Sequence, residues 1–310
     1  MAQFAAEQRL SLDDTVQRWL PGVVPNGDAI TVRQLMNHTS GLYDYIDVPF
    51  YIQLLREPLT TWQPLELVQR AVAHPPSFAP GTSWSYSNTN YILLGLIVAA
   101  IDKAPAPLQL ASPALEIDRR IVGPLGLSHT SFPLTDPDIH GPHAHGYAID
   151  PLPEWGLPAI LDTTRFNPSW AWTAGAIVST LEDVADFHRA LFTGQLLGAD
   201  QQRELETTVS AEPALDYGLG VFTLQTPCGP AWGHDGATPS AVSISLTSPD
   251  GSRQAVMMLT RDANTWTDQI RADYETALLT AFCGEELPAV PAPTLAATIA
   301  TALPSLQRLR

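Results

Sequence analysis

The chain has 310 residues, with 32 acidic and 16 basic side chains, so its formal net charge is −16 and its isoelectric point lies near 4.7. Phosphate recognition needs a basic surface, and this charge therefore excludes a nucleic acid as the partner. Hydrophobic residues make up 45% of the chain and aromatic residues 8%, which is enough for a full core and excludes global disorder.

The first part of the chain predicts short helices separated by turns. Residues 2–9 are expected to be the end of a helix, and residues 31–37 a short amphipathic helix capped by Thr31. Gly41 suits the left-handed turn that ends this second helix. An aromatic loop is expected next, followed by a helix over residues 64–73 that two prolines stop.

An apolar run dominates the middle of the chain. Tyr91–Ile101 is about half as long as a bilayer-spanning helix, so it predicts a buried helix and no transmembrane segment. The start of the chain shows no basic region followed by an apolar stretch, so we expect no signal peptide in it. Residues 104–113 carry prolines that favour a surface excursion. Ser179–Asp183 has the capping-box pattern and predicts a helix over residues 184–191.

From Tyr217 onward, apolar and polar residues alternate as they do in β-strands. The predicted strands are 217–224, 241–247 and 252–260, and Pro249–Gly251 marks a hairpin turn between the last two. The last third is therefore predicted to be an antiparallel meander, closed by a helix at about residues 265–282.

Several common catalytic signatures are absent from the sequence, including G-x-S-x-G, the Walker loop, H-E-x-x-H and a full G-x-G-x-x-G. His140, His143 and His145 suggest a metal site, but they lie among glycines and a proline without a nearby carboxylate or thiol set. We predict no metal and no cofactor. Cys228 and Cys283 form one disulfide or stay as two thiols, and their spacing leaves both open.

Three short segments carry candidate functional groups. Tyr86 and Asn88 lie at the entry to the buried helix, where a rigid element holds a phenol and an amide in place. Trp232–Gly236 opens a predicted strand, and its glycines let a ligand or another backbone come close. His38–Leu42 precedes the aromatic loop. Each segment alone also has a structural explanation as a buried phenol, a structural histidine or a helix-end contact.

The order and spacing of these segments resemble the serine penicillin-recognising family, which includes class C β-lactamases and the secreted D-alanyl-D-alanine carboxypeptidases of actinomycetes. The matching segments are Arg9–Asp14 (RLSLDD), Ile30–Leu42 (ITVRQLMNHTSGL), Tyr86–Tyr91 (YSNTNY), Pro124–Leu127 (PLGL), Ala174–Thr180 (AGAIVST), Tyr217–Gly220 (YGLG) and Gly233–Gly236 (GHDG). The resemblance implies one α+β domain over residues 1–284, of the β-lactamase/transpeptidase-like type. In it, an antiparallel sheet packed with helices faces a mainly helical lobe across a cleft. Residues 285–310, rich in Ala and Pro, are expected to be a loosely attached tail.

In this family a serine attacks an acyl carbonyl or a β-lactam ring, and water then releases the acyl-enzyme. The resemblance implies that Tyr86 relays a proton and that Asn88 holds the acyl amide of the substrate. It also implies that His234 and Gly236 occupy the K-T-G strand, which lines the substrate and supplies an oxyanion-hole donor. Trp170 and Phe50 are expected to wall the cleft, and a role as plain core residues is the equal alternative for both. The expected substrate is a small acyl-peptide, a β-lactam or an ester.

The secreted carboxypeptidases also carry a disulfide where this chain has its two cysteines. The resemblance therefore implies a bond between Cys228 and Cys283, and a location outside the cell or in the cell envelope. We expect a monomer.

One departure from the family concerns the nucleophile. The family's serine and lysine lie in an S-x-x-K turn, whereas the single lysine here, Lys103, follows Ala100 at that spacing. By the family's spacing the turn would end about eight residues before Met1, and the first strands of the sheet would precede it. We expect a fragment or a start codon placed too late, which is inactive as it stands.

A second departure concerns specificity. Related carboxypeptidases use a cation to bind the terminal carboxylate of the peptide, yet residues 221–227 contain no Arg or Lys. Either Arg165 or Arg261 replaces it, or the substrate is an ester, amide or lactam without that carboxylate. Two alternatives to a carboxypeptidase stay open, a non-catalytic peptidoglycan-binding pseudoenzyme and an esterase of the same family.

Overall fold

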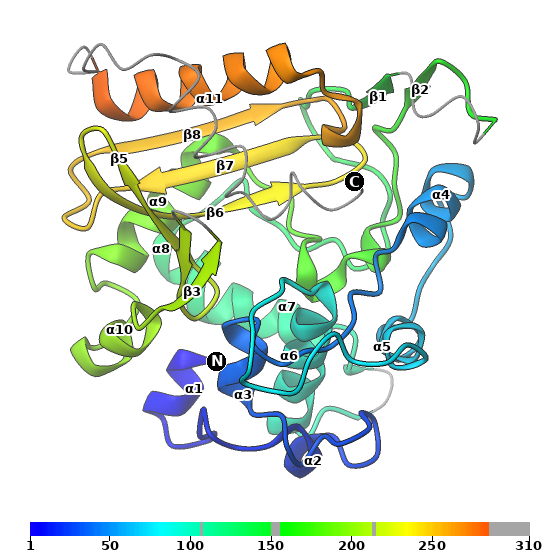
Figure 1. Cartoon of the computed structure of the whole chain (residues 1–310), viewed down its shortest axis with the longest axis vertical. Coiled ribbons are helices and arrows are strands. Elements are labelled where there is room, and N and C mark those ends of the chain that lie inside the picture. The colour runs from blue at the N-terminus through cyan, green and yellow to red at the C-terminus, as the bar shows by residue number, and fades with distance from the viewer. Residues whose placement is uncertain (106–107, 150–155, 213–214, 285–310) are drawn as a thin grey trace.

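The computed structural model describes residues 1–105, 108–149, 156–212 and 215–284, and the expected tail lies outside them. A six-stranded antiparallel sheet has helix α11 (Asp268–Cys283) on one face, and most other helices gather on the opposite side (Figure 1). This arrangement is the α+β architecture expected from the sequence.

The helical part of the chain consists mainly of short helices. Their bounds are α1 Ala2–Ala6, α2 Val16–Trp19, α3 Val32–Met36, α4 Val48–Arg56, α5 Pro64–Val72, α6 Asn88–Ile101, α7 Ser112–Ile117, α8 Gly123–Leu125, α9 Leu181–Phe192 and α10 Ala199–Leu205. A π-helical turn, Asp118–Val122, joins α7 to α8, and β1 (Tyr147–Ile149) and β2 (Ile160–Asp162) form a separate hairpin.

Capping side chains explain where several helices begin. In α3, Thr31 Oγ1 accepts a hydrogen bond from Gln34 N at 3.2 Å, while Gln34 Oε1 accepts one from Thr31 N at 2.9 Å. The predicted aromatic loop is wrong in part, because α4 forms within it. Asp47 caps α4 by accepting a hydrogen bond from Phe50 N at 2.9 Å, and an Asp before a helix is a capping signal that the sequence carries. Helix α9 begins at Leu181 with Thr180 as its cap, earlier than predicted.

The predicted buried helix is α6, which lies in the middle of the helical lobe. It buries residues on every side, as a helix without a polar face should. Gly95 of α6 lets the segment around Thr173 come close, since a Cβ at this position would lie 2.4 Å from Thr173 Oγ1. Gly41 has φ +76° and is needed for a second reason, because its Cβ would lie 2.1 Å from a backbone oxygen.

The sheet is the predicted meander, with each strand antiparallel to the next. Its strands, in spatial and chain order, are β3 Val209–Glu212, β4 Leu215–Tyr217, β5 Phe222–Thr226, β6 Gly229–Ala237, β7 Val242–Thr247 and β8 Gln254–Leu259. The predicted strand 217–224 is instead the end of β4, a turn and the start of β5, because Gly220 at φ +86° reverses the chain. The Trp232–Gly236 segment lies inside β6 and does not open it.

Strand β6 separates two hydrophobic cores. Ala231 belongs to the core that the sheet shares with Tyr274, Leu278 and Phe282 of α11. The next residue, Trp232, packs against the core of the helical lobe. Successive side chains of a strand point to opposite faces, so the sheet is covered by α11 on one face and by the helical lobe on the other.

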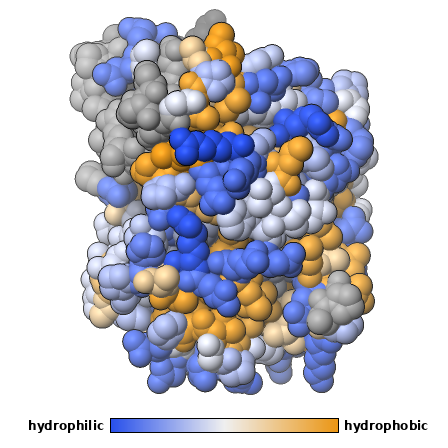
Figure 2. Space-filling model, turned by 90° about the vertical axis from the view of Figure 1, so that its right-hand side faces the viewer, coloured by the Kyte–Doolittle hydropathy of each residue, from blue (hydrophilic) through white to orange (hydrophobic). Residues whose placement is uncertain are grey.

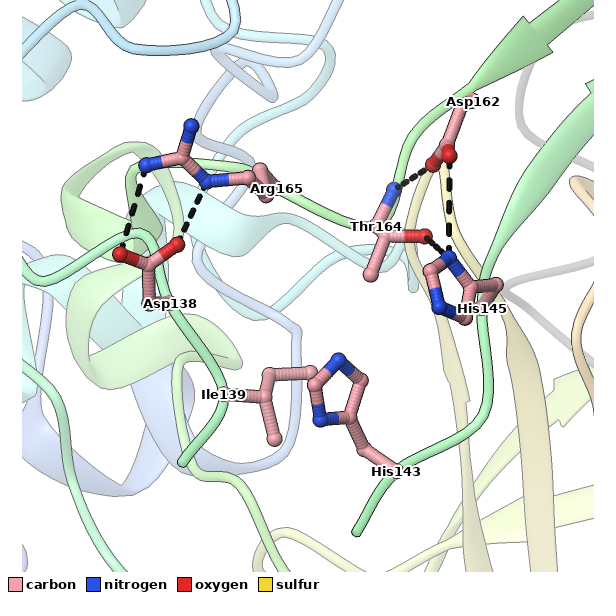
Figure 3. Close-up of a pocket in the computed structure, with 7 residues that line it drawn as sticks. All are labelled: Asp138, Ile139, His143, His145, Asp162, Thr164 and Arg165. Carbon is pink, nitrogen blue, oxygen red and sulfur yellow. Dashed lines mark hydrogen bonds and ion pairs between the residues drawn. The ribbon is translucent and has the colours of Figure 1, made fainter. Parts of the chain in front are cut away.

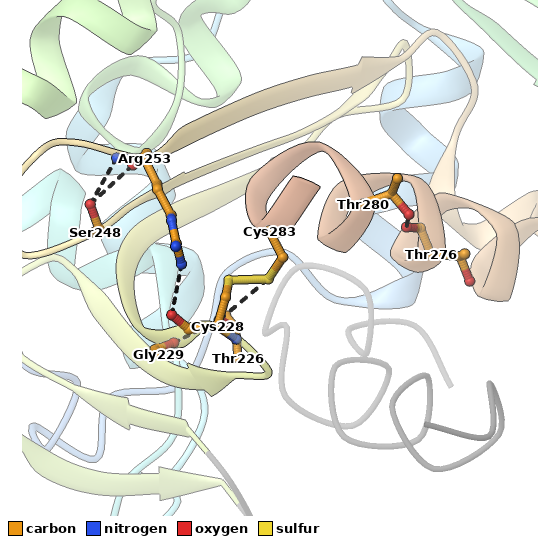
Figure 4. Close-up of a disulfide and its surroundings, with 8 residues drawn as sticks. All are labelled: Thr226, Cys228, Gly229, Ser248, Arg253, Thr276, Thr280 and Cys283. Atoms are coloured by element: carbon orange, nitrogen blue, oxygen red, sulfur yellow. Dashed lines mark hydrogen bonds between the residues drawn. A yellow bond between two sulfur atoms is a disulfide. The ribbon is translucent and has the colours of Figure 1, made fainter. Parts of the chain in front are cut away.

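A disulfide ties the end of α11 to the β5–β6 turn. Cys228 and Cys283 are bonded with their Cα atoms 5.6 Å apart, which confirms the implied pairing (Figure 4). Arg253 Nη1 donates to the carbonyl oxygen of Cys228 at 2.9 Å, and Thr226 Oγ1 donates to that of Gly229 at 2.6 Å. The last helix is thereby fixed to the sheet at its C-terminal end.

Much of the surface is hydrophilic, with hydrophobic patches among the polar groups, as the side that bears α4 and β1–β2 shows (Figure 2). Ile160 and Leu59 are two of the exposed apolar residues, with exposed fractions of 66% and 52%. In the described part of the chain, no helix combines the length and the apolar character that crossing a membrane requires.

Candidate active site

The motif segments His38–Leu42 and Tyr86–Tyr91 are held together by hydrogen bonds at the entry to α6. Ser40 Oγ donates to Asn90 Oδ1 at 2.7 Å, and Thr89 Oγ1 donates to the carbonyl oxygen of Tyr43 at 2.7 Å. Ser40, Thr89 and Asn90 are all buried, and buried polar groups in native proteins are usually hydrogen-bonded. The polar residues of both motifs therefore hold the turn that carries Tyr86 in one position.

His38 is the centre of this interface. Its side chain is completely buried, and Nδ1 accepts hydrogen bonds from Ser87 N at 3.1 Å and from Asn90 Nδ2 at 3.0 Å. Its carbonyl oxygen accepts a hydrogen bond from Ser85 N at 3.1 Å. Its ring stacks on Tyr86 with the centroids 4.0 Å apart. His38 thus fixes the backbone on both sides of Tyr86 and the plane of the Tyr86 ring.

Asn88, the first residue of α6, is 5% exposed, and its Nδ2 donates to Asp44 Oδ2 at 2.8 Å. Asp44 belongs to the segment that follows the His38–Leu42 motif, so the same interface also orients the Asn88 amide. With Nδ2 held by a carboxylate, Oδ1 is the amide atom that can accept a hydrogen bond from a substrate N–H.

The structure brings Tyr86 and His234 together from different lobes. Their ring centroids lie 6.1 Å apart, with Tyr86 just before α6 and His234 in β6. His234 Nε2 lies 2.8 Å from Tyr217 OH and 3.4 Å from Tyr91 OH. Tyr91 and Tyr217 were not singled out from the sequence, although Tyr217 opens the matching Y-G-L-G segment.

Strand β6 extends past the end of its neighbour at the position of His234. The β5–β6 ladder stops at the pair Phe222–Gly233, whereas the β6–β7 ladder continues to Ala237. Gly233 permits close approach of a backbone, because a Cβ there would lie 1.8 Å from Ser245 O of β7. The sequence allows either a ligand or another backbone to need this glycine, and at Gly233 it is the backbone of the neighbouring strand. A Cβ at Gly236 would lie 3.0 Å from Ser243 Oγ.

The remaining two predicted site residues belong to the core of the helical lobe. Phe50 is completely buried, with its ring centroid 4.9 Å from that of Trp62. Trp170 is 7% exposed, and its carbonyl oxygen accepts a hydrogen bond from Tyr45 OH at 2.6 Å. The expectation that Phe50 walls the cleft is wrong, because a side chain without exposed surface cannot meet a substrate from solvent. The core alternative also describes Trp170 better.

A buried acid–phenol contact joins the lobes elsewhere. Tyr51 of α4 donates a hydrogen bond to Asp262, which follows β8 and is 1% exposed. Burial raises the pKa of both the Tyr51 phenol and the Asp262 carboxyl. The two groups hold the end of the sheet against α4.

The predicted histidine cluster lies beside an open pocket of about 340 Å³ (Figure 3). Its lining residues are Asp138, Ile139, His143, His145, Asp162, Thr164 and Arg165. Arg165 Nε donates to Asp138 Oδ1 at 2.5 Å, so this guanidinium is engaged at the surface. Within the ranges that the structure covers, no three His, Cys, Asp or Glu side chains are grouped so that they could hold a metal ion.

The second candidate cation, Arg261, follows β8, and its backbone forms a bridge with Tyr147 of β1. This bridge attaches the β1–β2 hairpin to the end of the sheet. Thr163 Oγ1 also donates to Pro239 O in the β6–β7 turn at 2.9 Å. The hairpin and its pocket are therefore anchored next to the end of β6 that carries Gly236.

The chain is similar to proteins of known family and structure. The family model described as Beta-lactamase matches residues 1–280. A D-stereospecific amidohydrolase from Streptomyces sp. has a similar crystal structure, with 34% sequence identity and a TM-score of 0.80 over 91% of this chain and 82% of that one.

Two curated proteins are similar in sequence. Penicillin-binding protein 4* of Bacillus subtilis is 27% identical over 88% of this chain and 58% of its own length. Esterase EstB of Burkholderia gladioli is 28% identical over 74% of this chain and 60% of its own length. The chain thus spans about three-fifths of these relatives. With a family match over most of its length and the β-lactamase/transpeptidase-like fold, the chain belongs to the β-lactamase family of serine hydrolases.

Proposed function

We propose that this protein is a serine acyl hydrolase of the β-lactamase/DD-peptidase type, which works through an acyl-enzyme. The observation that carries the proposal is the meeting of Tyr86 and His234, with ring centroids 6.1 Å apart, where the helical lobe faces β6. Tyr86 is held by His38 and stands on a rigid helix entry. Such preorganisation is what a proton-transfer group needs.

In this proposal Tyr86 passes a proton from the attacking hydroxyl to the leaving nitrogen. Asn88 Oδ1 accepts a hydrogen bond from the acyl N–H of the substrate, because its Nδ2 is already bonded to Asp44. The backbone of β6 from His234 to Ala237, beyond the end of β5, lines the substrate and supplies an oxyanion-hole donor. These roles predict that Tyr86→Phe, in a polypeptide that carries an S-x-x-K turn, lowers kcat by orders of magnitude with little change in KM, since the phenol acts only during proton transfer.

Reaction requires a serine and a lysine, and the 310 residues contain no S-x-x-K sequence. We therefore propose that this chain by itself forms no acyl-enzyme. The coding DNA on the 5′ side of Met1 tests the origin of this absence, because an in-frame S-x-x-K would supply the nucleophile. If no reading frame encodes one, a non-catalytic peptidoglycan-binding protein becomes the better proposal.

The preferred substrate is an amide or an ester without a free terminal carboxylate. Residues 221–227 supply no cation, and Arg165 is engaged by Asp138. Similarity to an amidohydrolase and to an esterase supports the same choice. In a polypeptide that carries an S-x-x-K turn, hydrolysis of D-aminoacyl amides or p-nitrophenyl esters should exceed release of D-Ala from acyl-D-Ala-D-Ala. Faster D-Ala release would restore the carboxypeptidase proposal.

Location and assembly also remain proposals. The disulfide supports an extracellular or cell-envelope location, since such bonds persist in oxidising compartments. The expected monomer stays a prediction, which light scattering of the purified protein checks.

A further inference from the structure

Beside His234, two further phenols form a short chain of hydrogen bonds, and the ring centroids of Tyr91 and Tyr217 lie 5.9 and 6.2 Å from that of Tyr86. Tyr217 OH lies 2.8 Å from His234 Nε2, and Tyr91 OH lies 2.9 Å from Tyr217 OH. The other ring nitrogen, Nδ1, lies 2.5 Å from the carbonyl oxygen of Asp235. The chain of contacts therefore engages both nitrogens of the imidazole.

The partners decide where the protons lie. A carbonyl oxygen can only accept, so Nδ1 carries a hydrogen and donates it to Asp235 O. In a neutral ring Nε2 is then an acceptor. Tyr217 OH, at 2.8 Å, is the better-placed donor, since Tyr91 OH lies 3.4 Å away. The oxygen of Tyr217 in turn accepts the hydrogen bond from Tyr91 OH. One consistent direction runs from Tyr91 through Tyr217 to His234.

Tyr217 is well suited to hold this arrangement. Its side chain is completely buried, and burial raises the pKa of its phenol well above the usual range, so it keeps its proton. The rings of His38 and Trp84 pack against it, with centroids 5.0 and 5.7 Å away. A residue without exposed surface cannot touch a substrate, so Tyr217 acts through the groups that it contacts, and His234 is one of them at 2.8 Å.

We infer that Tyr217 is a positioning residue that fixes His234 as a neutral imidazole with its hydrogen on Nδ1, and that Tyr91 supports Tyr217 through the hydrogen bond between their hydroxyls. This inference rests on the proposed function for its catalytic meaning. In that function His234 would be a neutral group beside Tyr86 in the cleft. It would not serve as a general base, because its Nε2 lone pair already accepts a hydrogen bond.

Nitrogen chemical shifts test this without any turnover. The 310-residue chain is labelled with ¹⁵N-histidine, and His234→Gln identifies the His234 signals in a long-range ¹H–¹⁵N spectrum at pH 7.5. We expect a protonated Nδ1 and an unprotonated Nε2. A protonated Nε2, or a doubly protonated ring, in the wild-type spectrum overturns the inference whatever the variants do.

Two phenol deletions rank the partners. Tyr217→Phe removes the direct donor and should move the Nε2 signal downfield, toward a nitrogen without a hydrogen bond. Tyr91→Phe, the matched control, removes a hydroxyl that lies 3.4 Å from Nε2, against 2.8 Å for Tyr217 OH, and should move the signal less. An equal or smaller shift in Tyr217→Phe than in Tyr91→Phe contradicts the positioning role. If the shifts agree but a polypeptide that carries an S-x-x-K turn fails to acylate, the proposed function fails and the tautomer assignment stands.

Discussion

Glu275 on α11 should make the free energy of unfolding depend on pH, because its carboxyl group is buried. The side chain is 1% exposed, and neither carboxyl oxygen has a hydrogen-bond partner in the described part of the chain. Burial raises its pKa from 4.5 to about 7, and the Arg271 guanidinium one turn earlier opposes this rise only in part. The folded protein therefore keeps the proton in a pH range where the unfolded chain releases it.

The sign of the effect follows from proton binding. Below pH 4.5 the carboxyl is protonated in both states, so its pH-dependent contribution to stability is fully present. As pH rises toward 7, the unfolded state loses its proton first and the free energy of unfolding falls. Between pH 5 and 8 this loss amounts to at most about 2.5 kcal/mol for a pKa that rises from 4.5 in the unfolded chain to about 7 in the folded protein.

Glu275→Gln should remove this dependence because the amide is neutral throughout. Urea unfolding at pH 5, 6, 7 and 8 gives the free energy of unfolding of both proteins, and the difference between them isolates Glu275. Asp273→Asn is the control, since Asp273 lies on the same helix with its side chain exposed. A difference that stays constant within about 0.5 kcal/mol from pH 5 to 8 would refute the buried, unpartnered carboxyl.

Three further changes test other parts of the structure. Replacing Cys228 and Cys283 by Ser should lower the free energy of unfolding by about 4 kcal/mol, because the bond closes a loop of 55 residues; reduced wild-type protein should match the variant in a urea melt. Gly233→Ala should cost at least about 3 kcal/mol, because its Cβ would meet a β7 carbonyl at 1.8 Å, whereas Gly175→Ala, which meets nothing closer than 4.0 Å, should cost much less. His38→Ala should lower the free energy of unfolding by about 2–4 kcal/mol, because two buried donors lose their acceptor. His38→Asn should recover part of this loss, since Asn offers an acceptor and tolerates the φ of 60°. Equal losses in the two variants would argue against the acceptor role.

Local signals in the sequence predicted much of the fold. The Thr31 cap, the apolar run of α6 and the Pro249–Gly251 turn act over a few residues, and each produced the expected element. The end of β4 at Tyr217 and the extra helix α4 were missed for a similar physical reason. A turn glycine inside an alternating pattern and an Asp cap before aromatic residues compete with a more obvious periodicity.

The candidate site depended on the motifs, and its details depended on distant contacts. Tyr86, Asn88 and His234 could be named because they stand in short segments that match a family. The residues that hold these side chains in place could not be named, because Asp44 and Tyr217 reach Asn88 and His234 only after the chain folds. Phe50 shows the opposite error, since an aromatic side chain near a motif has no sequence signal that separates a cleft wall from a core residue.

The most direct test of the central claim is covalent labelling of the purified 310-residue chain by a fluorescent penicillin, read by intact-protein mass. The proposed proton-relay residue Tyr86, the proposed substrate-binding residue Asn88 and the edge of β6 all lie in this chain, but its sequence contains no S-x-x-K. We therefore predict an unchanged mass. A stable adduct on any serine of these 310 residues would contradict it and reveal a different nucleophile.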